Sequence, residues 1–333
     1  MDKGISGKEL ITVAVAVYNA KDYLAKAVDS IIEQDYQHLD SLLVDDGSTD
    51  GSSLICDEYV KKDTRIRVIH QNNGGLCVAR NTVIENMLGN YLMFVDNDDW
   101  IEKNTVSFLY NKMIENNLDM ASCSAVDIDE DLKNKKFNIR GGDKVFDSKE
   151  GIIDFYYARK FTFDGIQCKL YRKEVFKDLR FLPGRSVDDT LTTPQIMDKC
   201  KLMGYYDVCL YDYLVRKNSM CRSNYNSKSI DKVLAYIDNY QLIANKYPEA
   251  LKLLEHNIYG SAATNLLRLK VLKLEDEYIS DYKFYLELLK KYKPIISKDR
   301  LFVSMFYYVN KIPGMIDLLC ILFNKTIAKA VGA

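Results

Sequence analysis

The sequence predicts an α/β protein whose first half forms a doubly wound, mostly parallel sheet. Over residues 10–126, short apolar runs rich in β-branched residues alternate with helical patterns, and the connections between them are short. Two acidic clusters, Asp45–Asp50 and Asp96–Asp99, directly follow two of the apolar runs. Ligands bind outside the carboxyl ends of the strands in such sheets. The two clusters therefore predict a ligand site at one edge of the sheet.

The alternation in this half is read from two kinds of hydrophobic pattern. Strands are expected where short runs of Val, Ile, Leu, Phe or Tyr occur, at residues 10–17, 42–44, 66–69, 91–95 and 120–126. Helices are expected where apolar residues recur at intervals of three and four, at residues 21–34, 52–61, 79–87 and 104–116. Ser48 and Asp50 are typical capping residues and precede the second helix.

The second half is less regular. Residues 127–147 are polar and rich in Lys, Asp and Gly, which predicts a surface loop or a hairpin. A helix at 148–159 and strands at 167–171 and 206–215 follow, with an acidic turn at 186–189 between the two strands. Beyond residue 228 the pattern is helical and rich in Leu, Tyr and Lys, with few breakers before Pro294 and Pro313.

Composition excludes several classes of protein. The 333 residues predict about two domains, and the net charge of −1 gives no reason to expect nucleic-acid binding. The eight cysteines form no C-x-x-C pair, so we expect neither a zinc site nor disulfides, and a reducing compartment. The first residues lack the apolar core of a signal peptide, and no run is long enough to span a membrane.

The first acidic cluster can contribute to a nucleotide site. Backbone groups of Val17 and Asn19 leave a strand where they can meet a base or ribose, and Asp46 can accept a hydrogen bond from a base N–H. Asp45 is expected to brace its loop. The alternative is an ordinary strand–helix turn, because Asp, Gly, Ser and Thr are common turn residues.

The second cluster can hold a divalent cation. Asp96 and Asp98 are two residues apart, so their carboxylates would lie on the same side of an extended chain. A hard cation such as Mg²⁺ or Mn²⁺ suits carboxylate and phosphate oxygens and would neutralise a diphosphate leaving group. The alternative is a solvated acidic loop.

A glycine-rich segment lies between the clusters. Gly74 and Gly75 permit a close approach of the backbone to a ligand, and Arg80 follows at the start of a helix, from which it can reach phosphate. The alternative is a solvated Arg that follows a simple turn.

These segments together resemble the signature blocks of the family 2 inverting glycosyltransferases, which have the GT-A fold. The first four blocks are Val17-Tyr18-Asn19, Val44–Asp50, Asn73–Asn81 and Gly89–Asp99. Three later blocks are similar to further segments of that family, and they are Cys168–Glu174, Val187–Asp189 and Leu210–Ser219. The resemblance covers residues 10–222, and the blocks occur in the family's order.

The resemblance implies a role for each matched residue. Those that border the nucleotide-sugar are Val17, Asn19, Asp46 at uracil, Arg80 at the base or diphosphate, Asp96 at the ribose, and Asn97. Asp98 is implied as the ligand of Mg²⁺ or Mn²⁺, and Asp99, Trp100 and Lys169 as neighbours of the donor or acceptor sugar. Asp189 is implied as the catalytic base, with Asp188 as second candidate because it replaces the family's usual Glu.

The resemblance also implies a domain plan and an activity. Residues 1–225 would form a GT-A domain with a mixed sheet, divided into a Rossmann-like nucleotide half at 1–125 and an acceptor half at 126–225, and 226–333 a helical extension. The enzyme would transfer a sugar from a UDP-sugar to a glycan or lipid-linked glycan acceptor. The Q-x-x-R-W signature of processive members is missing, so we expect one sugar per encounter.

The last 44 residues are basic and partly apolar. Residues 290–333 hold eight basic and two acidic residues, a net charge of +6, which leaves −7 for the rest of the chain. Basic helices with Leu-rich and aromatic faces can lie in the headgroup region of an anionic membrane. We therefore expect a cytoplasmic protein at the inner face of the cell membrane. The alternative is that these helices pack on the catalytic domain or form a homodimer.

Three other functions are weighed. A sugar nucleotidyltransferase needs a glycine-rich loop with Lys or Arg after the first strand, and residues 16–20 lack one. A receiver-like regulatory module is much shorter than this chain. A catalytically inactive glycosyltransferase-like binding protein would be expected to lack some of the carboxylates, and only turnover decides against it.

Overall fold

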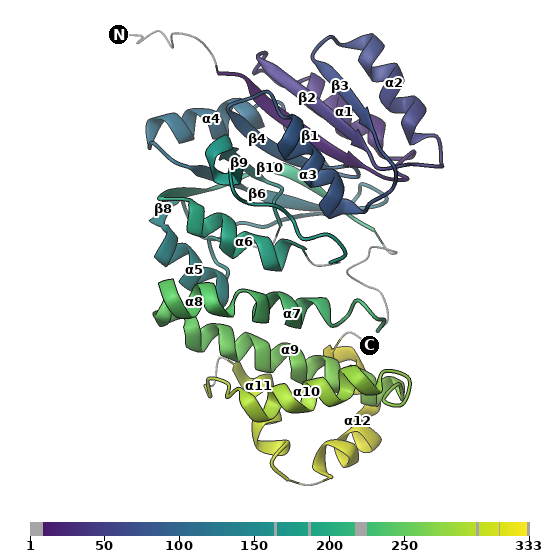
Figure 1. Cartoon of the computed structure of the whole chain (residues 1–333), viewed down its shortest axis with the longest axis vertical. Coiled ribbons are helices and arrows are strands. Elements are labelled where there is room, and N and C mark those ends of the chain that lie inside the picture. The colour runs from purple at the N-terminus through teal and green to yellow at the C-terminus, as the bar shows by residue number, and fades with distance from the viewer. Residues whose placement is uncertain are drawn as a thin grey trace. The chain divides into compact units, whose positions relative to one another are not determined.

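A computed structural model describes residues 9–162, 165–185, 188–216, 225–297, 300–312 and 314–331. Within these residues the named strands form one mixed sheet, in the order β3-β2-β1-β4-β9-β6-β10-β5, with β7 on β6 and β8 on β10 (Figure 1). The sheet is parallel from β3 to β4, and β9 joins this part to the parallel pair β6 and β10 by antiparallel pairing.

The strands are β1 (Ile11–Val17), β2 (Leu39–Asp45), β3 (Ile66–His70), β4 (Tyr91–Asp96), β5 (Trp100–Ile101), β6 (Met120–Asp129), β7 (Lys135–Phe137), β8 (Lys144–Asp147), β9 (Lys169–Arg172) and β10 (Leu202–Val215). The helices of the first 200 residues are α1 (Leu24–Ile32), α2 (Ser52–Lys62), α3 (Leu76–Asn86), α4 (Thr105–Glu115), α5 (Ser148–Tyr157), the 3₁₀ helix η1 (Lys173–Phe176) and α6 (Asp188–Lys199).

The later helices are α7 (Asp231–Asp238), α8 (Tyr240–Lys246), the 3₁₀ helix η3 (Pro248–Ala250), α9 (Leu251–Leu272), α10 (Ile279–Lys291), α11 (Leu301–Val309) and α12 (Met315–Val331). The chain divides into two compact units. The first comprises 1–151, 160–184 and 192–216, and the second comprises 152–159, 185–191 and 217–333. The expected boundary at residue 225, between the catalytic domain and the helical extension, stays a prediction from the sequence.

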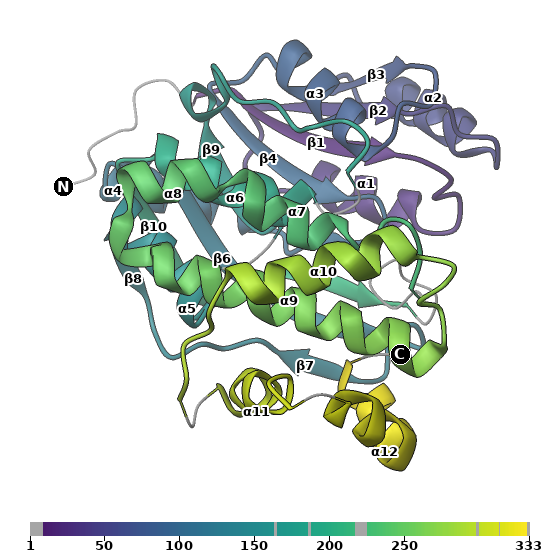
Figure 2. The same cartoon turned by 60° about the horizontal axis from the view of Figure 1, so that its bottom comes forward.

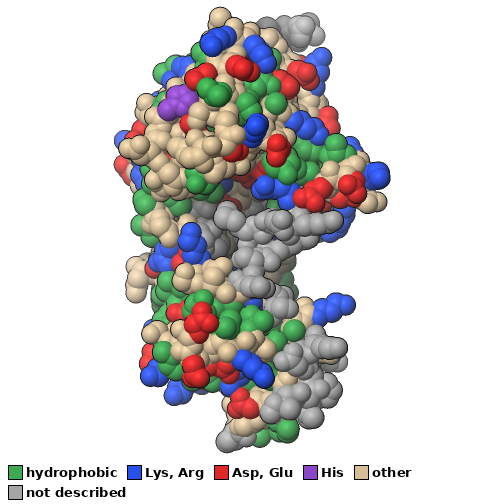
Figure 3. All heavy atoms as spheres, turned by 90° about the vertical axis from the view of Figure 1, so that its right-hand side faces the viewer, with side chains coloured by type: hydrophobic (Ala, Val, Ile, Leu, Met, Phe, Trp, Pro, Cys, Tyr) green, Lys and Arg blue, Asp and Glu red, His purple; other side chains and the backbone are tan. Residues whose placement is uncertain are grey.

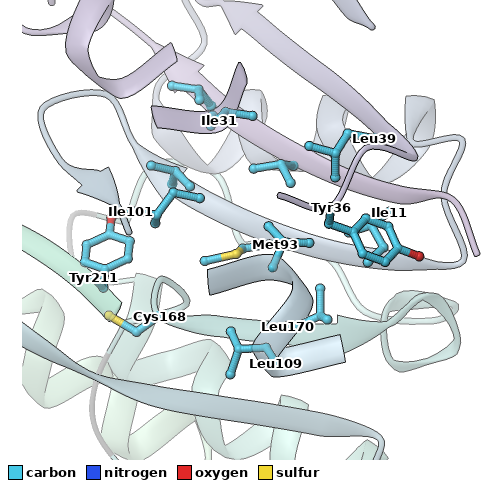
Figure 4. Close-up of a cluster of buried hydrophobic side chains, with 14 of the residues drawn as sticks. Ile11, Ile31, Tyr36, Leu39, Met93, Ile101, Leu109, Cys168, Leu170 and Tyr211 are labelled. Atoms are coloured by element: carbon cyan, nitrogen blue, oxygen red, sulfur yellow. The ribbon is translucent and has the colours of Figure 1, made fainter. Parts of the chain in front are cut away.

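One face of the sheet in the first unit carries a large hydrophobic core cluster (Figure 4). Helix α1 buries Leu24, Ala27, Val28 and Ile31 there, which is the spacing of one helix face. Residues of α2 and α4 belong to the same cluster, and strand residues such as Met93 alternate toward it. This packing confirms the expected alternation of strands and helices.

Close backbone contact between β1 and the turn before β4 depends on one glycine. A Cβ atom added at Gly89 would lie 2.5 Å from the Thr12 nitrogen and 2.7 Å from the Leu10 carbonyl oxygen. The Gly89 N–H also donates to Thr12 Oγ1 at 2.9 Å. Because the neighbouring atoms are backbone, they cannot rotate away, and any side chain here would push the starts of β1 and β4 apart.

The segment 127–147 contains the hairpin that was one of its two expected forms, because β7 pairs antiparallel with the end of β6, and β8 follows. Two other expectations drawn from the sequence differ from the structure. Strand β10 begins at Leu202 and is irregular between Tyr206 and Tyr211, which local hydrophobicity does not reveal. The chain is not extended through Asp96 and Asp98, because β4 ends at Asp96 and a turn follows, closed by a hydrogen bond from Asp99 N–H to the Asp96 carbonyl.

The second unit is helical, as expected for the C-terminal region. Helix α9 buries residues around most of its circumference and contacts α10, α11 and α12 (Figure 2). Its Asn265 donates to Tyr285 Oη, and Tyr225 bonds both Tyr285 Oη and Asp281. None of the described helices is both long enough and apolar enough to cross a membrane.

Charges of both signs are interspersed over the face drawn in Figure 3. The described residues on that face therefore present no large basic area of the kind that a phosphate backbone requires.

Candidate functional site

The carboxyl ends of four parallel strands lie at one level. Val17 of β1 is the register partner of Asp45 in β2, Asp45 is the partner of His70 in β3, and Ala16 is the partner of Asp96 in β4. Strand β1 lies between β2 and β4, so the order of the strands reverses beside it. A ligand crevice is expected outside the strand ends at such a switch point.

Two loops above β1 and β2 are bonded to each other. The side-chain Oδ1 of Asn19 accepts a hydrogen bond from Thr49 N–H at 2.9 Å, and the backbone N–H of Asn19 donates to Ser48 Oγ at 3.1 Å. Asn19 has a φ of 48°, which lies in the left-handed region that Asn tolerates better than most residues. Asp50 accepts from Lys21 N–H at 2.9 Å. The two loops therefore hold one another before any ligand binds.

Asp45 is buried beneath these loops and braces them, as expected. It accepts hydrogen bonds from Ser48 N–H at 3.1 Å and Ser53 Oγ at 2.6 Å, and it contacts His70 Nδ1 at 2.8 Å. Burial would raise the pKa of Asp45, but these hydrogen bonds outweigh burial and lower it. The other ring nitrogen of His70 lies 3.1 Å from Asp57. Sequence reasoning did not assign this contact of His70 with two carboxylates.

Asp46 fixes the glycine-rich segment. It is 2% exposed, and its carboxylate accepts hydrogen bonds from Gln71 Nε2 at 2.6 Å, Gly74 N–H at 2.9 Å and Gly75 N–H at 2.8 Å. Gly75 has a φ of 87°, a conformation that favours glycine. Asp46 therefore joins the end of β2 to the start of α3, the helix that carries Arg80.

Arg80 is buried and lies against the second acidic cluster. Its guanidinium is 3.4 Å from Asp96 Oδ1, and it stacks 5.6 Å from the ring of Phe181. Asp96 is 32% exposed, so this carboxylate keeps access to solvent. Asn97, the next residue, donates to the Ala16 carbonyl at 3.1 Å and thereby links the ends of β4 and β1.

Asp98 forms an ion pair with Arg216, which lies just beyond the end of β10. Asp98 is 17% exposed, and the Arg216 guanidinium also stacks on the ring of Tyr23 at 5.2 Å. The resemblance had placed Arg216 in a matched block without a role, and its partner could not be identified from the sequence because 118 positions separate the two. The end of that block, at Ser219, lies outside the described residues.

Asp99 belongs to the support of the site. It is 1% exposed and accepts hydrogen bonds from Tyr211 Oη at 2.9 Å and Leu214 N–H at 2.8 Å. Tyr211 Oη in turn accepts from Asp96 N–H at 3.1 Å. Burial, and then the charges of Asp96 and Asp98, raise the pKa of Asp99 well above its usual range. Tyr211 therefore couples β10 to the turn that carries the two more exposed carboxylates.

Trp100 and Lys169 make contacts of their own. The Lys26 ammonium lies 3.0 Å from the Trp100 ring centroid, and Trp100 pairs with Asp212 across β5 and β10. Burial raises the pKa of Asp212 to about 6. Lys169 is 2% exposed, and its ammonium donates to the carbonyl of Gly165. Both residues stay predicted neighbours of a sugar.

The carboxylates at the turn after β4 fit a cation whose remaining ligands are oxygen atoms of phosphate or water. No group of three or more potential His, Cys, Asp or Glu ligands occurs among the described residues. Asp96 and Asp98 provide the two accessible carboxylates at the turn, while Asp99 is buried and hydrogen-bonded elsewhere. Mg²⁺ is commonly held by one or two carboxylates together with phosphate oxygens and water.

Asp188 and Asp189 begin α6. Asp189 is half-buried and belongs to the second unit, whereas the strand ends belong to the first. Arg185, just before the helix, pairs with Asp238 of α7 at 2.8 Å, which anchors this segment within the second unit. The side chain of Asp188 and all of Val187 lie outside the described residues.

Comparison with protein families gives one match. The model of the family described as "Glycosyl transferase family 2" matches residues 12–180. Glycosyltransferase GlyA of Streptococcus pneumoniae is 38% identical over 218 residues, 64% of this chain but 31% of GlyA. Glycosyltransferase GlyG of the same organism is 34% identical over 227 residues, 66% of this chain and 75% of GlyG. This chain therefore spans about a third of the length of GlyA.

Two solved structures share the fold. S. aureus TarS 1–349 in complex with UDP-GlcNAc has a TM-score of 0.66 and 18% identity, and the match covers 97% of this chain and 90% of TarS 1–349. The mannosyltransferase PcManGT from Pyrobaculum calidifontis, in complex with GDP-Man and Mn²⁺, has a TM-score of 0.54 and 14% identity, and covers 98% and 88%. These likenesses confirm the expected GT-A fold with a helical C-terminal region.

The contacts of His70 predict a pH-dependent stability. The hydrogen bond to Asp45 raises the pKa of His70 above 6.5. A raised folded-state pKa stabilises the fold fully below the unfolded-state value, and that stability is lost as the pH rises through the folded-state value. His70→Gln should therefore lower the urea midpoint of unfolding more at about pH 6 than at about pH 9. Equal losses at both pH values would contradict a role for the imidazolium.

Proposed function

Since the chain belongs to glycosyl transferase family 2, we propose that it transfers one sugar from a nucleotide-sugar, with inversion, to a glycan acceptor. One observation carries the proposal. The ends of β1, β2 and β4 bring Val17, Asp46 and Asp96 to one switch point, with Arg80 buried beside them. Binding of a nucleoside diphosphate requires carboxylates that accept hydrogen bonds from the base and the ribose. It also requires a positively charged side chain, here Arg80, near the phosphates.

Uridine is the proposed nucleoside. An ionised carboxylate has about four acceptor positions, and three of those on Asp46 are used by Gln71, Gly74 and Gly75. We propose that the remaining position accepts the N3–H of uracil. Val17 and Asn19 would border the base and ribose, and Asp96 and Asn97 would contact the ribose.

Asp98 is the proposed ligand of Mg²⁺ or Mn²⁺, with Asp96 next to it. The cation would neutralise charge on the departing diphosphate. Arg216 already balances the charge of Asp98, so a cation bound there would release the guanidinium. Arg80, held by Asp96 and Phe181, would add a second positive charge near the leaving group.

Asp189 is the proposed base, with Asp188 as the second candidate. In an inverting transfer the carboxylate takes the proton from the acceptor hydroxyl while the oxygen bonds to the anomeric carbon. The bond from that carbon to the diphosphate breaks on the opposite face. A glycan or lipid-linked glycan of surface polysaccharide or glycoprotein synthesis is the proposed acceptor.

The C-terminal helices support a proposed site of membrane attachment. Helix α11 exposes Leu301, Phe302, Met305 and Tyr308, which recur along one side of the helix. Arg300 and Lys311 flank this stripe. We propose that the stripe lies in the headgroup region of the inner face of the cell membrane, with the enzyme in the cytoplasm. A homodimer through the same helices is the alternative occupant.

The first prediction of the proposal concerns nucleotide and metal. Calorimetry in Mn²⁺ should compare the affinities for UDP, CDP and GDP. UDP should bind more tightly than CDP, because cytosine has no N3–H that could donate to Asp46. Asp98→Asn should remove the metal-dependent part of UDP binding and abolish nucleotide release from a panel of UDP-sugars. Asp131→Asn, an exposed acid on the segment between β6 and β7, is the matched control. Equal affinity for UDP and CDP, or unchanged activity of the wild type in chelator, would refute these assignments.

The second prediction concerns the base. Asp189→Asn keeps the shape of the side chain and removes its basicity, so turnover should fall roughly 10²-fold or more while UDP binds as before. Asp188→Asn is the comparison variant. An inactive Asp188→Asn together with an active Asp189→Asn would reverse the assignment.

The third prediction concerns membranes. The full chain should float with anionic liposomes at low salt, and Phe302→Ser combined with Met305→Ser should reduce flotation. Leu54→Ser, at a position that is 68% exposed on α2, should not. Absence of flotation by the wild type, with a dimer seen by light scattering that the double variant disrupts, would favour the homodimer.

A further inference from the structure

The first unit contains a small cavity lined largely by polar residues, beside the proposed nucleotide site. Its volume is about 190 Å³, and its walls include Asp127, Asn138, Arg140, Gln167 and Tyr213. The cavity is smaller than most drug-sized pockets, which begin at roughly 300 Å³. It therefore has room for one small ring and no more.

The cavity lies at the same end of the sheet as the second acidic cluster. Gln167 forms a bridge with Phe94, two residues before Asp96 in β4. The strand that begins next, β9, pairs with both β4 and β6, and Asp127 lies near the end of β6. The cavity is thus next to β4 on the side opposite to β1.

One wall is held by a dedicated carboxylate. Asp207, in the irregular part of β10, accepts hydrogen bonds from the N–H groups of Arg140, Gly141 and Gly142 at 2.9, 2.7 and 2.8 Å. Burial would raise the pKa of Asp207, but these N–H donors outweigh it and lower the pKa. Gly141 and Gly142 have φ values of 97° and 109°, so this turn favours glycine at both positions. The turn places Arg140 at the cavity.

Another residue of the lining, Gln167, carries a buried acceptor, Oε1, that has no hydrogen-bond partner among the described residues. Lys169 fixes the backbone here, because its ammonium donates to the carbonyls of Gly165 and Gln167. A buried acceptor without a partner is costly, and a rotation of the Gln167 side chain toward the cavity that it lines would let a ligand O–H group satisfy the acceptor.

The lining offers both donors and acceptors in a small volume. Asp127 accepts from Asn138 Nδ2 at 2.7 Å through Oδ1, which leaves its second oxygen as an acceptor. Arg140 and the Gln167 amide can donate, while Tyr213 and Cys168 add less polar surface. We infer that this cavity binds one monosaccharide ring through its hydroxyl groups. The inference rests on the proposed function and names Gln167 and Asp127 as the residues that read the sugar.

The bound ring would be either the sugar of the donor or the terminal sugar of the acceptor. Calorimetry distinguishes these two cases. Gln167→Leu keeps the size of the side chain and removes its polar atoms. If the donor sugar occupies the cavity, the variant should bind the preferred UDP-sugar about tenfold more weakly and UDP as well as the wild type does. If the acceptor sugar occupies it, affinity for both nucleotides stays constant. Saturation-transfer signals from a panel of methyl glycosides added to the UDP-loaded protein should then fall.

Two further variants control the experiment. Asp127→Asn removes one charged acceptor and should weaken the same ligand as Gln167→Leu, which guards against a folding defect specific to position 167. Gln241→Leu, at an exposed position on α8, should change neither measurement. Unchanged sugar binding in both cavity variants, with UDP still bound, would overturn the inference and leave the proposed function intact. A wild type that binds no UDP would overturn the proposed function, and the inference with it.

Discussion

The parallel register of β1, β2 and β4 is the constraint on which the rest of the site depends. It aligns Val17, Asp45 and Asp96, so five of the six carboxylates in the two acidic clusters, those of Asp45, Asp46, Asp96, Asp98 and Asp99, lie at or just after the ends of β2 and β4. Carboxylates this close repel one another unless each has a partner. The structure supplies a different partner for each, and this difference separates the carboxylates that support the site from those that can meet a ligand.

The supporting carboxylates are buried and the others are not. Asp45 and Asp46 are each 2% exposed, and their hydrogen bonds hold the two loops and the glycine-rich segment. Asp99 is held by Tyr211 at a raised pKa. Only Asp96 and Asp98 of the five combine an arginine partner with access to solvent. Guanidinium partners can be exchanged for other cations without breaking the backbone network around them.

The sequence predicted the alternation of strands and helices because β1 to α4 bury simple periodic faces, as the spacing of Leu24 and Ile31 shows. It could not predict contacts between distant positions. The pairing of Asp98 with Arg216 and of Asp207 with the turn at Arg140 depends on where β10 lies in the sheet. The turn after Asp96 was missed for a related reason, since Tyr211 of β10, which is distant in sequence, bonds both Asp96 N–H and the Asp99 carboxylate beside the local hydrogen bond that closes the turn.

Gly89 has a consequence for how variants of this protein are interpreted. It lies at the start of β4, about 20 Å from the carboxyl end by strand length, yet its close backbone contact sets how β1 and β4 begin to pair. Register is transmitted along the whole strand pair. A substitution at this position would therefore resemble a binding-site lesion in an activity screen, although Gly89 lies at the other end of β4 from the proposed site. Loss of nucleotide affinity alone does not identify a residue of the site, and a measurement of folding must accompany it.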